Sequence, residues 1–278
     1  MGEIMENKIK VLGILLLAGF SFFYTNKVTD IIKDNDPIMS KIKETKKDIV
    51  VSKIDPVIIN DEYITGINGC IVDENESYNK MKNEGEYKEE LLVMKEDEVK
   101  QFNDKYIIGG NKKKRNVSII LLDIDNKLDN YIKKNNISIN YFLDGKYIVD
   151  NIDKIIGISK HSNIYNYGRN EKYTSKYIVY DNSIISTNLS NNSDYCLFKN
   201  KDKEGLKICS SYDMKSIKEE VINDDFLTYT KENLKNGKIY IYDNYNYEEI
   251  ELSIKYILSK GYNIVLLDEL LSESNNCR

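Results

Sequence analysis

The stretch Ile137-Ser-Ile-Asn-Tyr-Phe-Leu-Asp-Gly-Lys146 has the pattern of a short buried strand that ends at residue 143 and passes directly into a helix. From residue 145 to residue 160 the apolar side chains recur at helical spacing, as Ile148, Ile152, Ile155, Ile156 and Ile158. A buried strand followed at once by an amphipathic helix is the repeating unit of folds built on parallel sheets. The stretch therefore predicts an α/β domain.

The same alternation continues on both sides of this stretch. Upstream, residues 116–123 have the unbroken apolar character of a buried strand, and residues 128–134 have helical spacing. Downstream, the pattern predicts strands at 162–167, 237–242 and 263–267, and helices at 225–234, 250–259 and 267–272. Residues 173–189 have mixed periodicity and no assigned structure. The alternation places the whole of residues 105–273 in one α/β domain.

Several segments in this order resemble the polysaccharide deacetylase family. Residues 137–146 and 151–156 are similar to the family pattern "N-I-K-A-T-F-F-L-x-G" followed by "N-P-D-L-V-K-x-I". Residues 234–243 and 258–271 are similar to its later patterns "G-x-I-I-L-L-H" and "K-G-Y-x-F-V-T-L-S-E-L-L". The resemblance implies an α/β fold of the family's type, an irregular (β/α) barrel, but a fold does not settle a function.

Family chemistry uses a metal ion held by one aspartate and two histidines, an aspartate as base and a histidine as acid. On the resemblance, the base position is occupied by Leu122, which cannot accept a proton. The metal aspartate matches Asp123 or, after a two-residue slip, Asp125. An alignment with one inserted residue puts Tyr167 and Glu171 at the two metal-histidine positions.

Without that insertion, Asn166 and Asn170 take the metal-histidine positions instead. The acid position falls on Asp243. The single histidine of the chain, His161, matches a family histidine that is not a ligand, so we expect it to be structural. The arginine-proline motif that orients the base in the family has no counterpart around residues 194–197. The resemblance therefore implies a degenerate member without the standard catalytic residues, and we expect no cofactor.

Three functions are compatible with these residues. The first is a catalytically inactive protein that binds cell-wall glycan or a protein partner through a remnant cleft at the strand ends, formed by Asp123, Asp144, Tyr165, Asn166, Tyr167 and Asp243. For Asp123 and Asp243 a role as a turn or helix cap is an equal alternative. The second is an active carbohydrate deacetylase, whose divalent ion would be held by Asp123 or Asp125 with His161, Glu171 or Asp243. The third is a purely structural interaction protein of the cell surface.

The N-terminus predicts a membrane anchor. Residues 11–24 are apolar and uncharged and follow Lys8 and Lys10. The run is shorter than the ~20 residues of a full span, so it also fits the core of a signal peptide. An uncleaved signal anchor is favoured because no small-x-small cleavage pattern follows. By the positive-inside rule the two lysines would stay in the cytoplasm. We therefore expect a single-pass protein of the cell membrane with its C-terminal domain outside.

The expected organisation has four parts. These are a cytoplasmic tip and anchor helix (1–26), a stalk (27–49), a small mixed module (50–104) and the deacetylase-like domain (105–273). The net charge of −5 with interspersed signs gives no nucleic-acid footprint. The four cysteines lack a C-x-x-C spacing, which argues against a zinc site. Residues 195–209 read as a β-hairpin that would place Cys196 opposite Cys209, either as a disulfide or as two reduced thiols.

Overall fold

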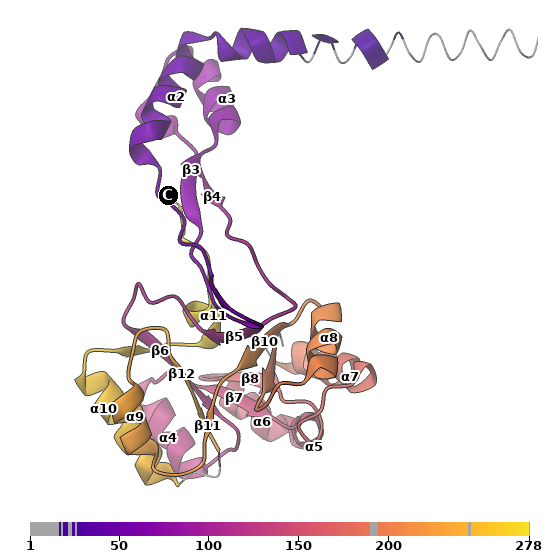
Figure 1. Ribbon diagram of the computed structural model, residues 1–278, viewed down its shortest axis with the longest axis vertical. Coiled ribbons are helices and arrows are strands. Elements are labelled where there is room, and N and C mark those ends of the chain that lie inside the picture. The colour runs from indigo at the N-terminus through magenta and orange to yellow at the C-terminus, as the bar shows by residue number, and fades with distance from the viewer. Residues whose placement is uncertain are drawn as a thin grey trace, which may run out of the picture. The chain divides into compact units, whose positions relative to one another are not determined.

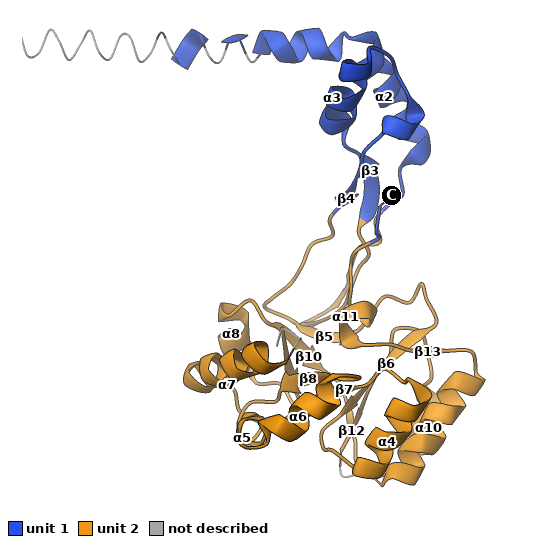
Figure 2. Ribbon diagram, turned by 180° about the vertical axis from the view of Figure 1, so that it is seen from behind, with its two compact units in different colours: residues 1–52, 69–97, 275–278 blue, residues 53–68, 98–274 orange. Residues whose placement is uncertain are grey.

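The structure is a computed structural model, and it describes residues 17, 19–21, 24–25, 27–189, 194–243 and 246–277. The chain forms two compact units (Figure 2). The first unit consists of residues 1–52, 69–97 and 275–278, and the second of residues 53–68 and 98–274. Both units are therefore assembled from segments that are far apart in the sequence.

The second unit is built on two sheets of mainly parallel strands. One sheet has the order β11-β12-β6-β7-β8, with β13 also paired to β6. The other has the order β1-β2-β5-β10-β9, in which only the β1–β2 pair is antiparallel. The strands of the first sheet are β6 (Asn116–Leu121), β7 (Asn140–Leu143), β8 (Asn163–Asn166), β11 (Val221–Ile222), β12 (Ile239–Tyr242) and β13 (Asn263–Ile264). Those of the second are β1 (Val57–Ile59), β2 (Glu62–Ile64), β5 (Tyr106–Gly109), β9 (Tyr195–Phe198) and β10 (Lys215–Lys218).

Alternate side chains of these strands enter two different cores. Ile120, Phe142 and Leu197 come from both sheets and share one interior core. The neighbouring Ile119 and Tyr141 point the other way, into a core that also contains residues of the helices. Two parallel sheets that enclose a common core, with helices outside, confirm the predicted α/β architecture.

The helices cover the outside of the strands (Figure 1). A first group, α4 (Asn126–Asn135), α9 (Phe226–Asn233) and α10 (Tyr247–Ser259), lies together beside β6 and β12. The remaining helices are α5 (Gly145–Asp150), α6 (Ile152–Ser159), α7 (Ser175–Asn188), α8 (Lys203–Ser211) and α11 (Leu267–Leu270). Several begin at an aspartate whose side chain accepts backbone N–H groups: Asp125 for α4, Asp144 for α5 and Asp202 for α8.

The first unit is a small α+β structure with its own core. It contains α2 (Pro37–Ile49), β3 (Gly69–Val72), α3 (Glu74–Glu84), the 3₁₀ turn η1 (Glu89–Leu91) and β4 (Met94–Asp97). Met39 and Ile42 of α2 are buried with Val72, Tyr78 and Met81. A disulfide joins Cys70 of β3 to Cys277.

Two parts of the expected organisation differ from the structure. Residues 27–49, expected as a stalk, include helix α2, whose apolar face is buried in the first unit. The expected small module, residues 50–104, is divided between the two units, because β1 and β2 extend the sheet of the second unit through β5. The physical reason is that β1 and β2 are too short to form a stable sheet alone and instead continue an existing one.

Two local predictions are also corrected. Residues 195–209 are not a hairpin, because Asp202 caps a helix through the N–H groups of Glu204 and Gly205. Cys196 in β9 and Cys209 in α8 are nevertheless joined by a disulfide. The helix expected at 145–160 is two helices, interrupted at Asn151, where the backbone leaves the helical conformation (φ −124°, ψ 27°).

The predicted anchor at residues 11–24 lies largely outside the described residues. Within the part of the chain that the structure describes, no helix is both long and apolar enough to cross a membrane.

Candidate functional site

The carboxyl ends of the parallel strands bring together the polar residues that could act on a ligand. In such sheets the loops that follow the strands form the usual ligand-binding edge. Five polar residues lie at this edge, each at a strand end or within two residues after it: Asp123 after β6, Asp144 after β7, Asn166 in β8, Lys199 after β9 and Asp243 after β12.

The centre of this edge is an ion-pair cluster that we call the Lys199 site, formed by Lys199, Glu171, Asp243 and Tyr167. The Lys199 Nζ lies 2.7 Å from Glu171 Oε1 and 2.9 Å from Asp243 Oδ2. The Lys199 and Asp243 side chains are only 27% and 17% exposed. Burial lowers the pKa of Lys199, but the hydrogen bonds that its ammonium donates to Glu171 and Asp243 outweigh this effect, so that the pKa is raised overall. Lys199 is therefore a fixed positive charge.

Tyr167 is the fourth residue of the Lys199 site. Its ring centroid lies 5.9 Å from the Lys199 Nζ, and its side chain is 6% exposed. Burial, together with the negative charges of Glu171 and Asp243, raises the pKa of Tyr167, so the hydroxyl stays protonated. This buried hydroxyl has no hydrogen-bond partner within the described part of the chain.

Glu171 reaches Lys199 from an unusual turn. Arg169 and Lys172 exchange two backbone hydrogen bonds, and the two residues between them, Asn170 and Glu171, have φ values of 50° and 60°. Positive φ at both central residues is typical of a type I′ turn. Asparagine tolerates this conformation, but glutamate adopts it at a cost of roughly 1 kcal/mol. The preceding Gly168 also has a positive φ of 73°, and a side chain there would overlap Lys172.

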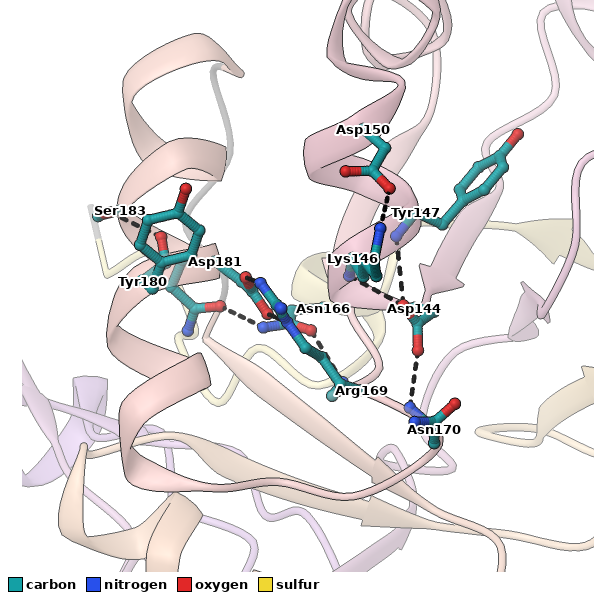
Figure 3. A network of polar contacts seen from close by, with 12 residues as sticks. Asp144, Lys146, Tyr147, Asp150, Asn166, Arg169, Asn170, Tyr180, Asp181 and Ser183 are labelled. Carbon is teal, nitrogen blue, oxygen red and sulfur yellow. Dashed lines mark hydrogen bonds and ion pairs between the residues drawn. The ribbon is translucent and has the colours of Figure 1, made fainter.

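A second polar network fixes this turn from its other side (Figure 3). Asp144 accepts from the backbone N–H of Asn170 at 2.7 Å while it caps α5. Arg169 donates from Nε and Nη2 to the fully buried carboxylate of Asp181, at 3.1 and 2.6 Å. The Asn166 amide donates to Asn182. Asp144 and Asn166 thus hold the framework of the turn.

Beside the same turn lies a hollow of about 560 Å³, which we call the tyrosine hollow. The Arg169 guanidinium stacks over the Tyr177 ring at 4.1 Å, and the Tyr180 ring is half exposed. Its lining consists of Arg169, Lys176, Tyr177, Val179, Tyr180 and Ser183.

Three residues considered for the site have other roles. Tyr165 stacks on Phe142 inside the barrel and donates its hydroxyl to Asp268 of α11, so it is not at the carboxyl edge. Asp125 caps α4 by accepting from Lys127 and Leu128. His161 contacts Asp129 of α4 through Nε2 at 2.9 Å, which agrees with a structural histidine. Asp123 accepts from the next backbone N–H, at Ile124, and Leu122 is partly buried against the interior core.

The residues present do not fit a catalytic metal ion. Among the described residues, no three or more His, Cys, Asp or Glu side chains are grouped so that they could hold one. Glu171 and Asp243 do converge, but the Lys199 ammonium already lies between them. Lys199 was not found from the sequence, because its partners are 28 and 44 residues away. The only sequence signal is a cation directly after a buried strand.

No protein-family model and no curated protein sequence matches the chain. Solved structures do match. BA3943 of Bacillus anthracis, described as a CE4 family pseudoenzyme, superposes with a TM-score of 0.56 at 19% identity over 86% of this chain and 96% of its own. The peptidoglycan N-acetylglucosamine deacetylase Bc1960 gives 0.51 at 13% identity, over 62% and 95%. PdaA of Bacillus subtilis, a family 4 carbohydrate esterase, gives 0.50 at 16% identity, over 61% and 85%.

At these identities the likeness concerns the fold. The match to BA3943 covers more of the chain than the second unit alone, so it extends into the first unit. The chain has the fold of the CE4 polysaccharide deacetylases, as the resemblance in its sequence predicted, and its single histidine cannot supply the two metal-binding histidines that the resemblance implies for an active member.

Proposed function

We propose that this chain is a catalytically inactive deacetylase-like protein that binds cell-wall glycan at the carboxyl edge of its strands. The observation that carries the proposal is the Lys199 site. A protonated lysine pairs with Asp243, the residue at the family's acid position, and Leu122 stands at the base position. A leucine cannot remove a proton, and a carboxylate neutralised by an ammonium is a poor proton donor.

The chemistry of the edge suits a glycan. The carboxylates of Glu171 and Asp243 are acceptors for sugar hydroxyls. The tyrosine hollow next to the same turn adds exposed ring faces, on which the apolar face of a sugar can pack. Bc1960, which has the same fold, is described as acting on peptidoglycan N-acetylglucosamine, which supports wall glycan as the class to test.

We further propose that the protein is anchored in the cell membrane by residues 11–24, with both units on the outer side. The apolar run behind Lys8 and Lys10 supports the anchor. The pairing of all four cysteines in two disulfides supports an oxidising compartment, because cytosolic thiols are kept reduced.

Glycan binding is tested with the purified full-length chain and soluble wall fragments containing N-acetylglucosamine. A ligand that binds only the folded state raises the melting temperature with concentration. Asp243→Asn should weaken the affinity by about tenfold or more, because hydrogen bonds to charged groups contribute about 1.5–3 kcal/mol. Tyr180→Ala should weaken it if the hollow takes part.

Matched controls keep the test specific. Asp61→Asn breaks a similar lysine–aspartate pair, with Lys201, away from the Lys199 site. Leu258→Ala removes a comparably exposed apolar side chain on α10. Both controls should bind as the wild type does. A melting temperature that does not respond to any fragment would contradict glycan binding.

A further inference from the structure

In the Lys199 site a positive charge lies between carboxylate oxygens, as a metal ion does between its oxygen ligands. One ammonium lies within 3 Å of two carboxylates from different loops, Glu171 in the turn after β8 and Asp243 after β12. We infer that Lys199 is a built-in cation that takes the place of a metal ion, so that the wild-type site is closed to divalent ions and becomes a divalent site when Lys199 is removed. This inference concerns the same site as the proposed function but does not depend on what the site binds.

The positions of the residues support this inference. In the alignment with one inserted residue, Tyr167 and Glu171 stand at the metal-histidine positions and Asp243 at the acid position. The structure brings these three residues together around the Lys199 Nζ. Of the alternative pair, Asn166 donates to Asn182 and accepts from the Gly168 N–H, and the Asn170 backbone N–H donates to Asp144 (Figure 3).

Electrostatics explains why the ammonium and a metal ion exclude each other. Hard divalent ions take oxygen ligands at about 2.0–2.6 Å, which is inside the space that the ammonium occupies between the two carboxylates. Two like charges at that separation in a half-buried site repel strongly. The Lys199 ammonium is held at hydrogen-bond distance by both carboxylates, at 2.7 and 2.9 Å.

The same two carboxylates can bind another cation when Lys199 is replaced by an uncharged residue. Glu171 is held in place by a turn with two consecutive positive φ values, itself fixed by Asp144 through Asn170. The Tyr167 ring centroid lies 5.9 Å from the Lys199 Nζ, and its buried hydroxyl has no hydrogen-bond partner among the described residues. The two carboxylates that converge on Lys199 supply oxygen ligands of the kind that Mn²⁺ and Ca²⁺ prefer.

The test is Lys199→Met in the full-length chain, which keeps most of the length of the side chain and removes the ammonium group. We expect the wild type to show no change in melting temperature with Mn²⁺ or Ca²⁺ and to retain neither ion. We expect Lys199→Met to bind about one Mn²⁺ per chain, with a rise in melting temperature of roughly 5 °C at a hundredfold excess over the Kd. The double variant Lys199→Met/Asp243→Asn should lose this response.

Lys201→Met is the matched control, since Lys201 lies two residues further on and pairs with Asp61 outside the site. It should not gain metal binding. If Lys199→Met does not fold in the presence of a chelator, Mn²⁺ should restore folding where NaCl of equal ionic strength does not. The inference is overturned if the wild type binds Mn²⁺ or Ca²⁺ and the Asp243→Asn variant does not. It is also overturned if Lys199→Met binds neither ion and neither ion restores its folding. Because no glycan is used, failure here is separate from failure of the proposed function.

Discussion

The residue Asp181 forms a buried ion pair with Arg169 beside the Lys199 site. Its carboxylate is fully buried on α7, where desolvation is costly, and Arg169 compensates it with two hydrogen bonds. Gly145 also faces this carboxylate, and a Cβ there would overlap with it and come within 2.8 Å of Asn166 Oδ1. The turn that carries Glu171 therefore depends on one buried ion pair.

We expect Arg169→Met to lower the free energy of unfolding by about 3 kcal/mol, because it leaves an unpaired buried charge. The double variant Arg169→Met/Asp181→Leu should recover most of this loss, since it removes both charges. Urea denaturation at an unchanged m-value measures both effects. Equal destabilisation in the single and double variants would argue against the charge as the cause.

Glu273 gives a prediction that depends on pH. Its side chain is only 6% exposed. Burial raises the pKa of Glu273, partly opposed by the positive charge of Lys215 and by hydrogen bonds with Gln101 and the Gly66 backbone. The folded state therefore holds the proton more tightly than the unfolded state, whose pKa is about 4.3, and stability falls as the pH rises through the folded pKa.

Glu273→Gln should accordingly raise the free energy of unfolding at pH 7, on the order of 1 kcal/mol. The gain should disappear below pH 4, where the wild-type carboxyl group becomes neutral in both states. Chemical denaturation of the two proteins from pH 4 to pH 7 checks the trend. A constant difference across that range would show that titration is not its origin.

At the scale of an element, the turn from Arg169 to Lys172 combines local strain with a defined role. Glu171 adopts a left-handed backbone conformation that is unfavourable for glutamate, and its carboxylate forms an ion pair with Lys199. The Glu171 side chain is 54% exposed, and a pair this exposed contributes at most about 1 kcal/mol. The pair therefore does not explain why glutamate is present at this position.

We expect Glu171→Gly to leave stability unchanged or to raise it by up to about 1 kcal/mol, because glycine adopts a positive φ without strain. Ligand binding should nevertheless weaken, as expected where a site sacrifices stability for function. Thermal denaturation and glycan titration of the same sample separate the two effects. A clear loss of stability would mean that Glu171 serves the fold.

Some strands and helices were predictable from the sequence, and others were not. The strands at residues 116–121 and 140–143 were predictable because they are continuous apolar runs next to amphipathic helices. Helix α8 was missed because two cysteines on either side of a polar segment suggested a hairpin, although Asp202 is a recognisable helix cap. Strands β5 and β10 were missed because neither run stands out without the sheet that pairs them.

The candidate site was predictable only in part. Asp243, Tyr167 and Glu171 followed from a resemblance at matched positions, and the structure places them together. Lys199 and Arg169 depend on contacts between distant segments, which no local pattern contains. Tyr165 was expected at the remnant cleft, but strand alternation directs it into the barrel interior.

At the scale of the whole molecule, two disulfides close loops of very different length. Cys196–Cys209 spans 13 residues of the second unit, whereas Cys70–Cys277 spans 207 and fixes the C-terminal segment to β3 of the first unit. In the chain-entropy view the longer loop constrains the unfolded state more.

We expect the Cys70→Ser/Cys277→Ser variant to lose about 5 kcal/mol and the Cys196→Ser/Cys209→Ser variant about 3 kcal/mol. The first variant should also expose its C-terminal segment to carboxypeptidase. Intact mass after alkylation should show no labelled cysteine in the native protein and four after reduction. Labelling without reduction would contradict the pairing.

Acetate released from N-acetylated wall glycan by the full-length chain, in the presence of Zn²⁺ or Co²⁺, measures directly whether the protein is catalytically inactive. With Leu122 at the base position and Lys199 between Glu171 and Asp243, we predict no acetate above the no-protein background over many hours. Repeated turnover by the wild type that is lost in Asp243→Asn would contradict the central claim that this edge binds without hydrolysing.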